Sequence, residues 1–158
     1  MEPPSTFSVS VLNNSSARGV SQRIREAVSV VLALHGKPAA GVCVLLTSDK
    51  QVRALNREFR EIDEATDVLS FPAPSDTYSL GDIAIAVPYA RRQAKKRGVR
   101  VEVELCYLAI HGVLHLLGFD DVREADHQAM IQEMAKAGRA AGLPVEEAWH
   151  SIMHEVSA

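Results

Sequence analysis

The chain has 158 residues, of which 47% are apolar and 23% are charged. This length and balance are typical of one soluble globular domain over residues 1–158, and they exclude a disordered, collagen-like or coiled-coil architecture. The net charge is −3, so the chain has no global basic field for nucleic acid or membranes. Any attraction to a polyanion must come from a local patch.

The cysteine content and the N-terminal residues indicate the compartment. Cys43 and Cys106 each lie within an apolar run, and we predict two buried free thiols, which favours a reducing environment. Residues 1–6 lack the basic and apolar regions of a signal peptide. No run of residues approaches the ~18 apolar residues of a membrane span. We expect a cytoplasmic protein that does not enter membranes.

The first half of the chain alternates predicted strands and helices. Apolar and polar residues alternate over 7–11, which predicts a half-buried strand. Apolar residues at helical spacing run from Val20 to Leu34, and Gly36 is placed to end that helix. Residues 41–47 are continuously apolar, as in a central strand, and Ser48 is the predicted N-cap of the next helix.

The second half contains two strands followed only by helices. The strands are predicted over 66–71 and 81–87, and a helix follows from Pro88 to Gly98. Residues 101–117 are apolar on almost every side, which predicts a helix buried at the centre of the domain. Further helical segments follow around Met130 and Trp149. This order predicts an α+β fold: a small mixed four-stranded sheet with helices packed on it, one of them buried.

The predicted central helix carries a pair of candidate metal ligands. His111 and His115 lie about 40° apart on one helical face, one turn apart, and two imidazoles at this spacing can bind one metal ion. The same spacing also occurs on helices that bind no metal, but burying unpaired imidazoles is costly. Gly118 is placed to end the helix in a left-handed turn, after which Asp121 can return toward the pair. Such a three-ligand site keeps a coordination position open, as in catalytic metal sites. Gly112 replaces the glutamate base of the HExxH proteases, which disfavours protease chemistry.

Three sequence blocks resemble one known family. His111–Asp120 resembles the signature of the YbeY family of metal-dependent endoribonucleases. Leu55-Asn56 with Arg60, followed by residues 66–72, and then residues 80–83 are similar to the same family in the same order. The resemblance implies a mixed sheet with a central metal-bearing helix and cleavage of single-stranded RNA. It also implies a role in ribosomal RNA processing, including 16S 3′-end maturation, and in ribosome quality control, with the ribosome or its small subunit as partner.

The resemblance implies zinc held by three histidines, but this chain has Asp121 at the third position. Aspartate binds zinc at about 2.0–2.2 Å, so we expect His111, His115 and Asp121 to hold one divalent ion. The anionic ligand lowers the charge of the site and makes it more similar to sites that hold Fe²⁺. Zn²⁺ is the expected metal, with Fe²⁺ or another transition metal as the alternative. His127 is a second candidate for the third ligand, and Asp120 is interpreted as a capping or orienting residue.

Arginine and lysine side chains are the candidate RNA contacts. The resemblance implies that Arg60 is functional, and its guanidinium can hold a phosphate bidentately beside the catalytic His111 and His115. The alternative is a surface ion pair with Glu61 or Glu64. Six of the 17 basic residues lie within 91–100. The predicted RNA-backbone contacts among them are Arg91, Arg92, Lys95 and Lys96, and a solvated helix face is the alternative.

The expected function is therefore single-strand-specific, metal-dependent cleavage of RNA in ribosomal RNA processing. Two alternatives stay open. One is a metal-binding, ribosome-associated accessory factor with little nuclease activity, an interpretation that the Asp121 replacement keeps open. The other is a metal hydrolase that acts on a different substrate.

Overall fold

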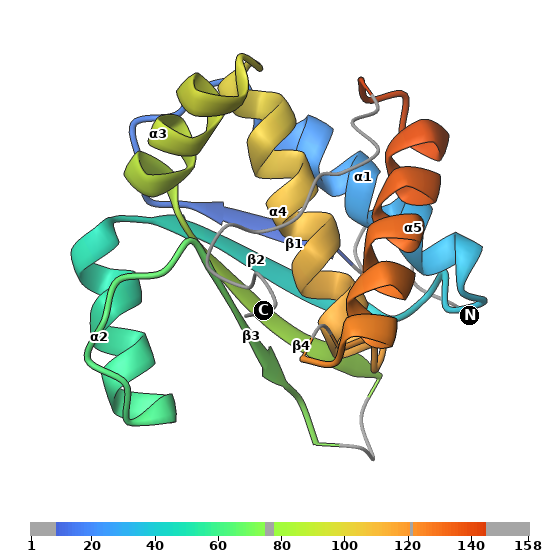
Figure 1. Ribbon diagram of the computed structural model, residues 1–158, viewed down its shortest axis with the longest axis horizontal. Coiled ribbons are helices and arrows are strands. Elements are labelled where there is room, and N and C mark those ends of the chain that lie inside the picture. Colours follow the sequence, from blue (N-terminus) through green and yellow to red (C-terminus); the bar gives the residue numbers. More distant parts are fainter. Residues whose placement is uncertain (1–8, 75–77, 121, 145–158) are drawn as a thin grey trace.

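The computed structural model describes residues 9–74, 78–120 and 122–144. Within these ranges the chain forms four strands and five helices in the predicted order (Figure 1). The strands are β1 (Val9–Asn13), β2 (Gly41–Thr47), β3 (Val68–Pro72) and β4 (Ser79–Ala86). The helices are α1 (Ser21–Leu34), α2 (Asp49–Arg60), α3 (Val87–Arg97), α4 (Val101–Leu116) and α5 (Glu124–Ala140). The start of the predicted first strand and the segment around Trp149 lie outside the described residues.

The four strands form one mixed sheet in the order β1-β2-β4-β3. β1, β2 and β4 run parallel, and β3 pairs antiparallel with β4 at the edge. β2 lies between two strands, as its continuous apolar run predicted: Val44 is fully buried on one face and Leu45 is half-buried on the other. The predicted α+β fold with a small mixed four-stranded sheet is confirmed.

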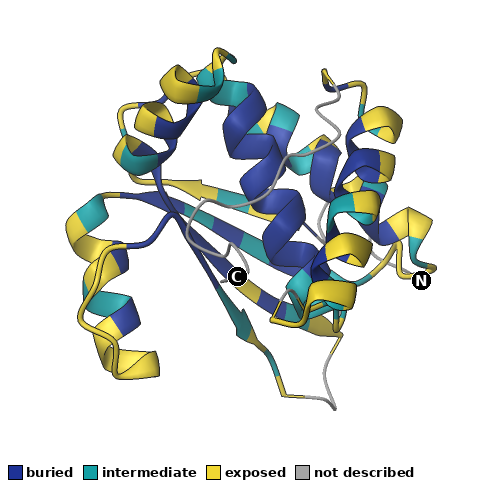
Figure 2. Ribbon diagram, in the orientation of Figure 1, coloured by how far each residue is buried: buried dark blue, intermediate teal, exposed yellow. Residues whose placement is uncertain are grey.

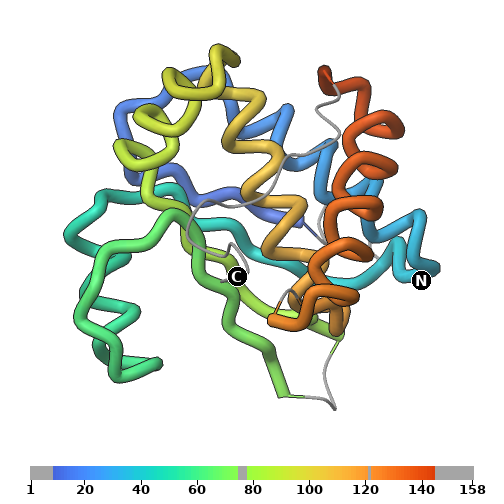
Figure 3. The backbone as a smooth tube through the Cα atoms, viewed as in Figure 1, coloured from blue at the N-terminus to red at the C-terminus, as the bar shows by residue number. Residues whose placement is uncertain are grey.

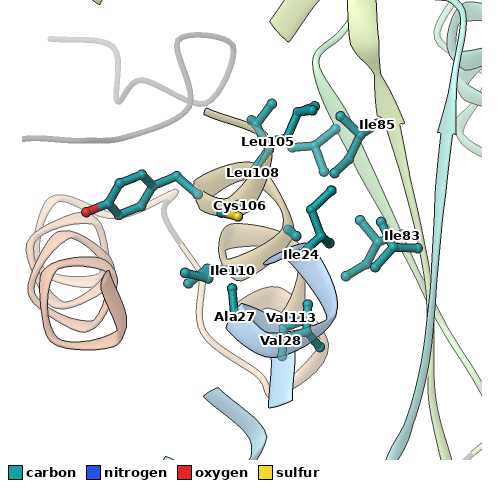
Figure 4. Packing of buried hydrophobic residues seen from close by; sticks show 14 of the residues in the cluster. Ile24, Ala27, Val28, Ile83, Ile85, Leu105, Cys106, Leu108, Ile110 and Val113 are labelled. Atoms are coloured by element: carbon teal, nitrogen blue, oxygen red, sulfur yellow. The ribbon is translucent and has the colours of Figure 1, made fainter. Parts of the chain in front are cut away.

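Helix α4 is the buried helix that its composition predicted. Every residue from Val103 to Leu114 is buried, and the helix lies between α1 and the sheet, with side chains of α1 and β4 packed against it (Figure 4). At Gly112 the helix comes so close to β4 that a Cβ atom would lie 2.9 Å from Cγ2 of Ile83. A side chain at residue 112 would therefore force Ile83 to shift.

The two faces of the sheet are covered unequally. On one face, α1, α3, α4 and α5 contribute to the larger cluster of buried apolar residues. On the other face, α2 forms a small cluster in which Val52 packs against Leu69 and Ala84. Helix α2 is largely exposed (Figure 2). Part of the sheet on this side is left open.

Local signals at the helix ends agree with the sequence. The Ser48 hydroxyl accepts a hydrogen bond of 3.1 Å from the Gln51 N–H, as the predicted N-cap of α2. Gly118 has φ +104°, and after it the chain doubles back as α5 alongside α4 (Figure 3).

None of the helices in the described ranges combines the length and apolarity needed to cross a bilayer.

Both cysteines are free. Burial raises the pKa of Cys106 from 9.0 to about 12, so its thiol stays protonated and acts as a small apolar side chain. The prediction that Cys43 is buried is wrong, because the pleat of β2 directs its side chain to the open face of the sheet, where it is half-buried.

Candidate active site

The two histidines of α4 point their ring nitrogens at each other. The Nε2 atoms of His111 and His115 are 3.0 Å apart, and the rings meet edge to face at 81°. Two nitrogens bound to one tetrahedral ion at 2.0–2.1 Å would be about 3.3 Å apart. The pair is therefore already close to the geometry in which both Nε2 atoms bind the same ion. His111 is fully buried and His115 is half-buried.

The His115 side of the pair opens into a pocket of about 390 Å³. The pocket lies between the end of α4, the edge strand β3 and the turn that follows α4. Its lining is Arg60, Val68, Ser70, Pro72, His115, Leu116, Asp120 and Val122. Arg60 and His115, which the sequence predicted to act together, thus share one cavity although they lie on different elements.

Arg60 reaches this pocket from the opposite face of the sheet. It is the last residue of α2, and its Nη2 donates a 3.3 Å hydrogen bond to the Ser70 carbonyl, on the side of β3 that does not face β4. Arg60 forms no ion pair with Glu61 or Glu64 in the described part of the chain. The geometry therefore departs from the surface ion pair that was the alternative.

The end of α2 is fixed by residues that the sequence analysis did not single out. Glu61 adopts the left-handed conformation at φ 60° and is the one non-glycine residue with positive φ in the described ranges. The buried Asn56 side chain donates a 3.0 Å hydrogen bond to the Glu64 carbonyl, which ties the helix to the loop after it. Asn56 belongs to the same sequence block as Arg60, and this was the feature of the sequence that could have pointed to the role of Asn56.

Ser70 joins the edge strand to the helix of the histidines. Its hydroxyl donates a 3.1 Å hydrogen bond to the Gly112 carbonyl, one residue after His111. Because the Ser70 carbonyl also accepts from Arg60, this residue contacts both functional elements. It lies in the block of residues 66–72, but its chemistry alone gave no sign of this role.

The turn after α4 is closed by backbone hydrogen bonds. Gly118 N–H donates to the His115 carbonyl at 3.0 Å, and Phe119 N–H donates to the Leu114 carbonyl at 2.9 Å. Asp120 caps the next turn, since its Oδ1 accepts from the Val122 N–H at 3.2 Å. This agrees with the capping interpretation of Asp120.

The third ligand stays a prediction. Asp121 lies outside the described residues. Within the residues that the structure does describe, no three His, Cys, Asp or Glu side chains gather as a metal site, so His127 does not join His111 and His115 there. His127 is instead buried in α5.

The basic run is not part of this pocket. Arg91 donates to the Ser16 hydroxyl at 3.1 Å, and Arg92 forms a 2.7 Å ion pair with Asp49. Lys95 and Lys96 are exposed. All four lie on α3, which stands by the N-terminal end of α4, whereas His115 is at the other end of that helix (Figure 1). The RNA contact at α3 therefore remains a prediction, and it would involve nucleotides away from those in the histidine pocket.

Comparisons with known proteins identify the family of the chain. A family model described as "Endoribonuclease YbeY" matches residues 10–141. The chain belongs to the YbeY family. A member from Anaeromyxobacter dehalogenans, named Endoribonuclease YbeY, is 44% identical over 126 residues, which cover 78% of this chain and 65% of that protein. A member of the same name from Thermus thermophilus is 46% identical over 121 residues, with 73% and 87% covered.

A solved structure supports the family fold. The solution structure of TM1509 from Thermotoga maritima superimposes with a TM-score of 0.62 at 26% identity, covering 84% of this chain and 88% of that one. The chain spans just under two thirds of the length of the Anaeromyxobacter YbeY protein. The match of residues 10–141 includes all three blocks that carried the sequence resemblance, which is thereby confirmed.

Proposed function

We propose that this protein is a metal-dependent endoribonuclease that cleaves single-stranded RNA. The observation that carries the proposal is the convergence of the His111 and His115 Nε2 atoms beside a pocket that also contains Arg60. Membership of the YbeY family, whose curated members are named endoribonucleases, supports this chemistry.

The donor atoms fit a divalent transition metal. Neutral imidazole nitrogens suit zinc and iron alike, and the 3.0 Å Nε2 separation is close to that of two ligands on one ion. We infer that His111, His115 and Asp121 hold the ion, Zn²⁺ in the first instance. When bound, the ion supplies Lewis acidity toward a phosphodiester and lowers the pKa of a coordinated water.

Arg60 is placed to hold the scissile phosphate. Arg60 lines the pocket, and one of its guanidinium nitrogens donates to the Ser70 carbonyl. A guanidinium carries five N–H donors, so this one hydrogen bond leaves most of them for a phosphate. A cation fixed in this way binds the phosphate and neutralises the charge that develops on it during cleavage. The hydrogen bond to Ser70 restrains the guanidinium group before RNA binds. Arg60 therefore loses less conformational entropy on binding the phosphate than a freely moving arginine would.

The biological substrate that we propose is ribosomal RNA of the small subunit. The resemblance of the three sequence blocks supports processing of the 16S 3′ end and ribosome quality control, with the ribosome or its small subunit as partner. The protein would do this work in the cytoplasm, a setting that suits two free cysteines.

Cleavage of a labelled single-stranded ribosomal RNA fragment by zinc-loaded protein tests the proposal. We expect the wild type to cut and His115→Ala to be inactive. Arg60→Ala should cut about 100-fold more slowly while keeping its metal, as when a charge-stabilising donor is removed. The matched control is Arg57→Ala, an exposed arginine of the same helix that does not line the pocket. Equal cutting by wild type and His115→Ala would show a contaminating nuclease. No cutting by any of them would favour the accessory-factor alternative.

A further inference from the structure

A second cavity lies on the open face of the sheet. It has a volume of about 630 Å³ and lies beside α2, on the side of the sheet away from α4. Its lining is mainly apolar. Two of the apolar lining residues are unusually exposed, Leu12 at 54% and Phe59 at 62%. Parallel strands are normally covered on both faces, so a partly open face of this kind calls for an occupant.

The floor of this groove contains a row of side chains from three neighbouring strands. Cys43, Asp82 and Phe71 are cross-strand neighbours on β2, β4 and β3, and all three line the groove. The Phe71 ring meets the exposed Phe59 ring edge to face, with centroids 5.5 Å apart. The groove therefore combines two aromatic rings with one exposed carboxylate.

The groove and the candidate active site adjoin at β3, the edge strand of the sheet. Successive side chains of a strand point to opposite faces, so Ser70 lines the active-site pocket and Phe71 lines the groove. Pro72 lines both cavities. Phe59 in the groove and Arg60 in the pocket are consecutive residues. A single-stranded polymer held by Arg60 thus meets the groove as soon as it passes over β3.

We propose that this groove binds the unpaired bases that adjoin the cleaved phosphodiester. The inference rests on the proposed nuclease function, because Arg60 places the phosphate from which these bases extend. Base faces stack on aromatic side chains whatever their sequence, and Phe59 presents such a surface. Asp82 accepts a hydrogen bond from an exocyclic amino group, as acidic side chains do from cytosine N4. Uracil has no amino group, so the groove favours cytosine over uracil.

Binding of fluorescent 12-nucleotide 2′-O-methyl RNAs, checked on gels for integrity, tests the groove separately from cleavage. Phe59→Ala should weaken binding about tenfold, within the range expected for one lost base stack. Phe59→Tyr should restore it to within about twofold, because tyrosine keeps the ring. The matched control is Leu34→Ala, which truncates an exposed apolar residue of α1, outside the groove. Asp82→Ala should abolish the preference of the wild type for oligo(C) over oligo(U).

The outcomes separate this inference from the proposed function. An unchanged dissociation constant for Phe59→Ala, or an equal loss for Leu34→Ala, overturns the groove and leaves it to another occupant such as a protein segment. If 12-mers bind in a Phe59-dependent manner but no RNA is cut, the nuclease proposal fails and the groove stands. Failure of the wild type to bind either oligonucleotide overturns the groove, and cleavage of the ribosomal RNA fragment then decides the nuclease proposal separately.

Discussion

The close approach of α4 to the sheet can be tested by adding a single methyl group. In Gly112→Ala the new Cβ would lie 2.9 Å from Cγ2 and 3.0 Å from Cδ1 of Ile83. Ile83 is fully buried in β4 and its Cγ2 is attached at the branch point of the side chain, so it has little room to move. Overpacking of this kind costs about 1–3 kcal/mol. Alanine in a helix interior offsets about 1 kcal/mol of that cost relative to glycine. We expect a net destabilisation of about 1 kcal/mol.

Urea unfolding followed by circular dichroism measures this difference. For a slope of about 2 kcal/mol per molar urea, the midpoint should fall by about 0.5 M. Repeating the substitution in an Ile83→Ala background provides the control, because all three atoms that crowd the new methyl are then absent. There Gly112→Ala should stabilise by about 1 kcal/mol, the helix-propensity term alone. A stabilising effect in the wild-type background would refute the close packing of α4 on β4.

Three further predictions follow from single residues. Ser48→Ala should destabilise the protein by about 1 kcal/mol in the same assay, because it removes the N-cap of α2. Since burial raises the pKa of Cys106 to about 12, the folded protein keeps a proton that the unfolded chain loses above about pH 9. Stability should therefore fall as the pH rises from about 9 to 12, and a Cys106→Ala variant should show a smaller fall in alkaline urea titrations. In chelator competition, Asp121→Ala should weaken zinc binding more than about 100-fold. The reason is that loss of a residue that only hydrogen-bonds a metal ligand already lowers metal affinity about 10–100-fold. His127→Ala should leave zinc binding unchanged. The opposite pattern would make His127 the third ligand.

The sequence by itself determined the features that depend on one element at a time. Helical periodicity placed His111 and His115 on one face, and the observed Nε2 atoms converge as that spacing requires. The uniformly apolar composition of residues 101–117 identified the buried helix. Boundaries were less accurate: β3 begins at Val68 rather than Thr66, because the register of β3 with β4 starts at Val68, opposite Ile85.

The tertiary structure alone decided which elements share the site. Arg60 lies on a helix that covers the face of the sheet opposite α4, and it reaches the histidine pocket only because β3 is an edge strand. The basic residues of α3 are closer to His111 and His115 in sequence than Arg60 is, yet α3 lies by the far end of α4. The physical reason is that residue spacing fixes the faces of a single helix or strand, whereas the order of strands and the side on which a helix crosses the sheet arise from packing between segments far apart in the chain.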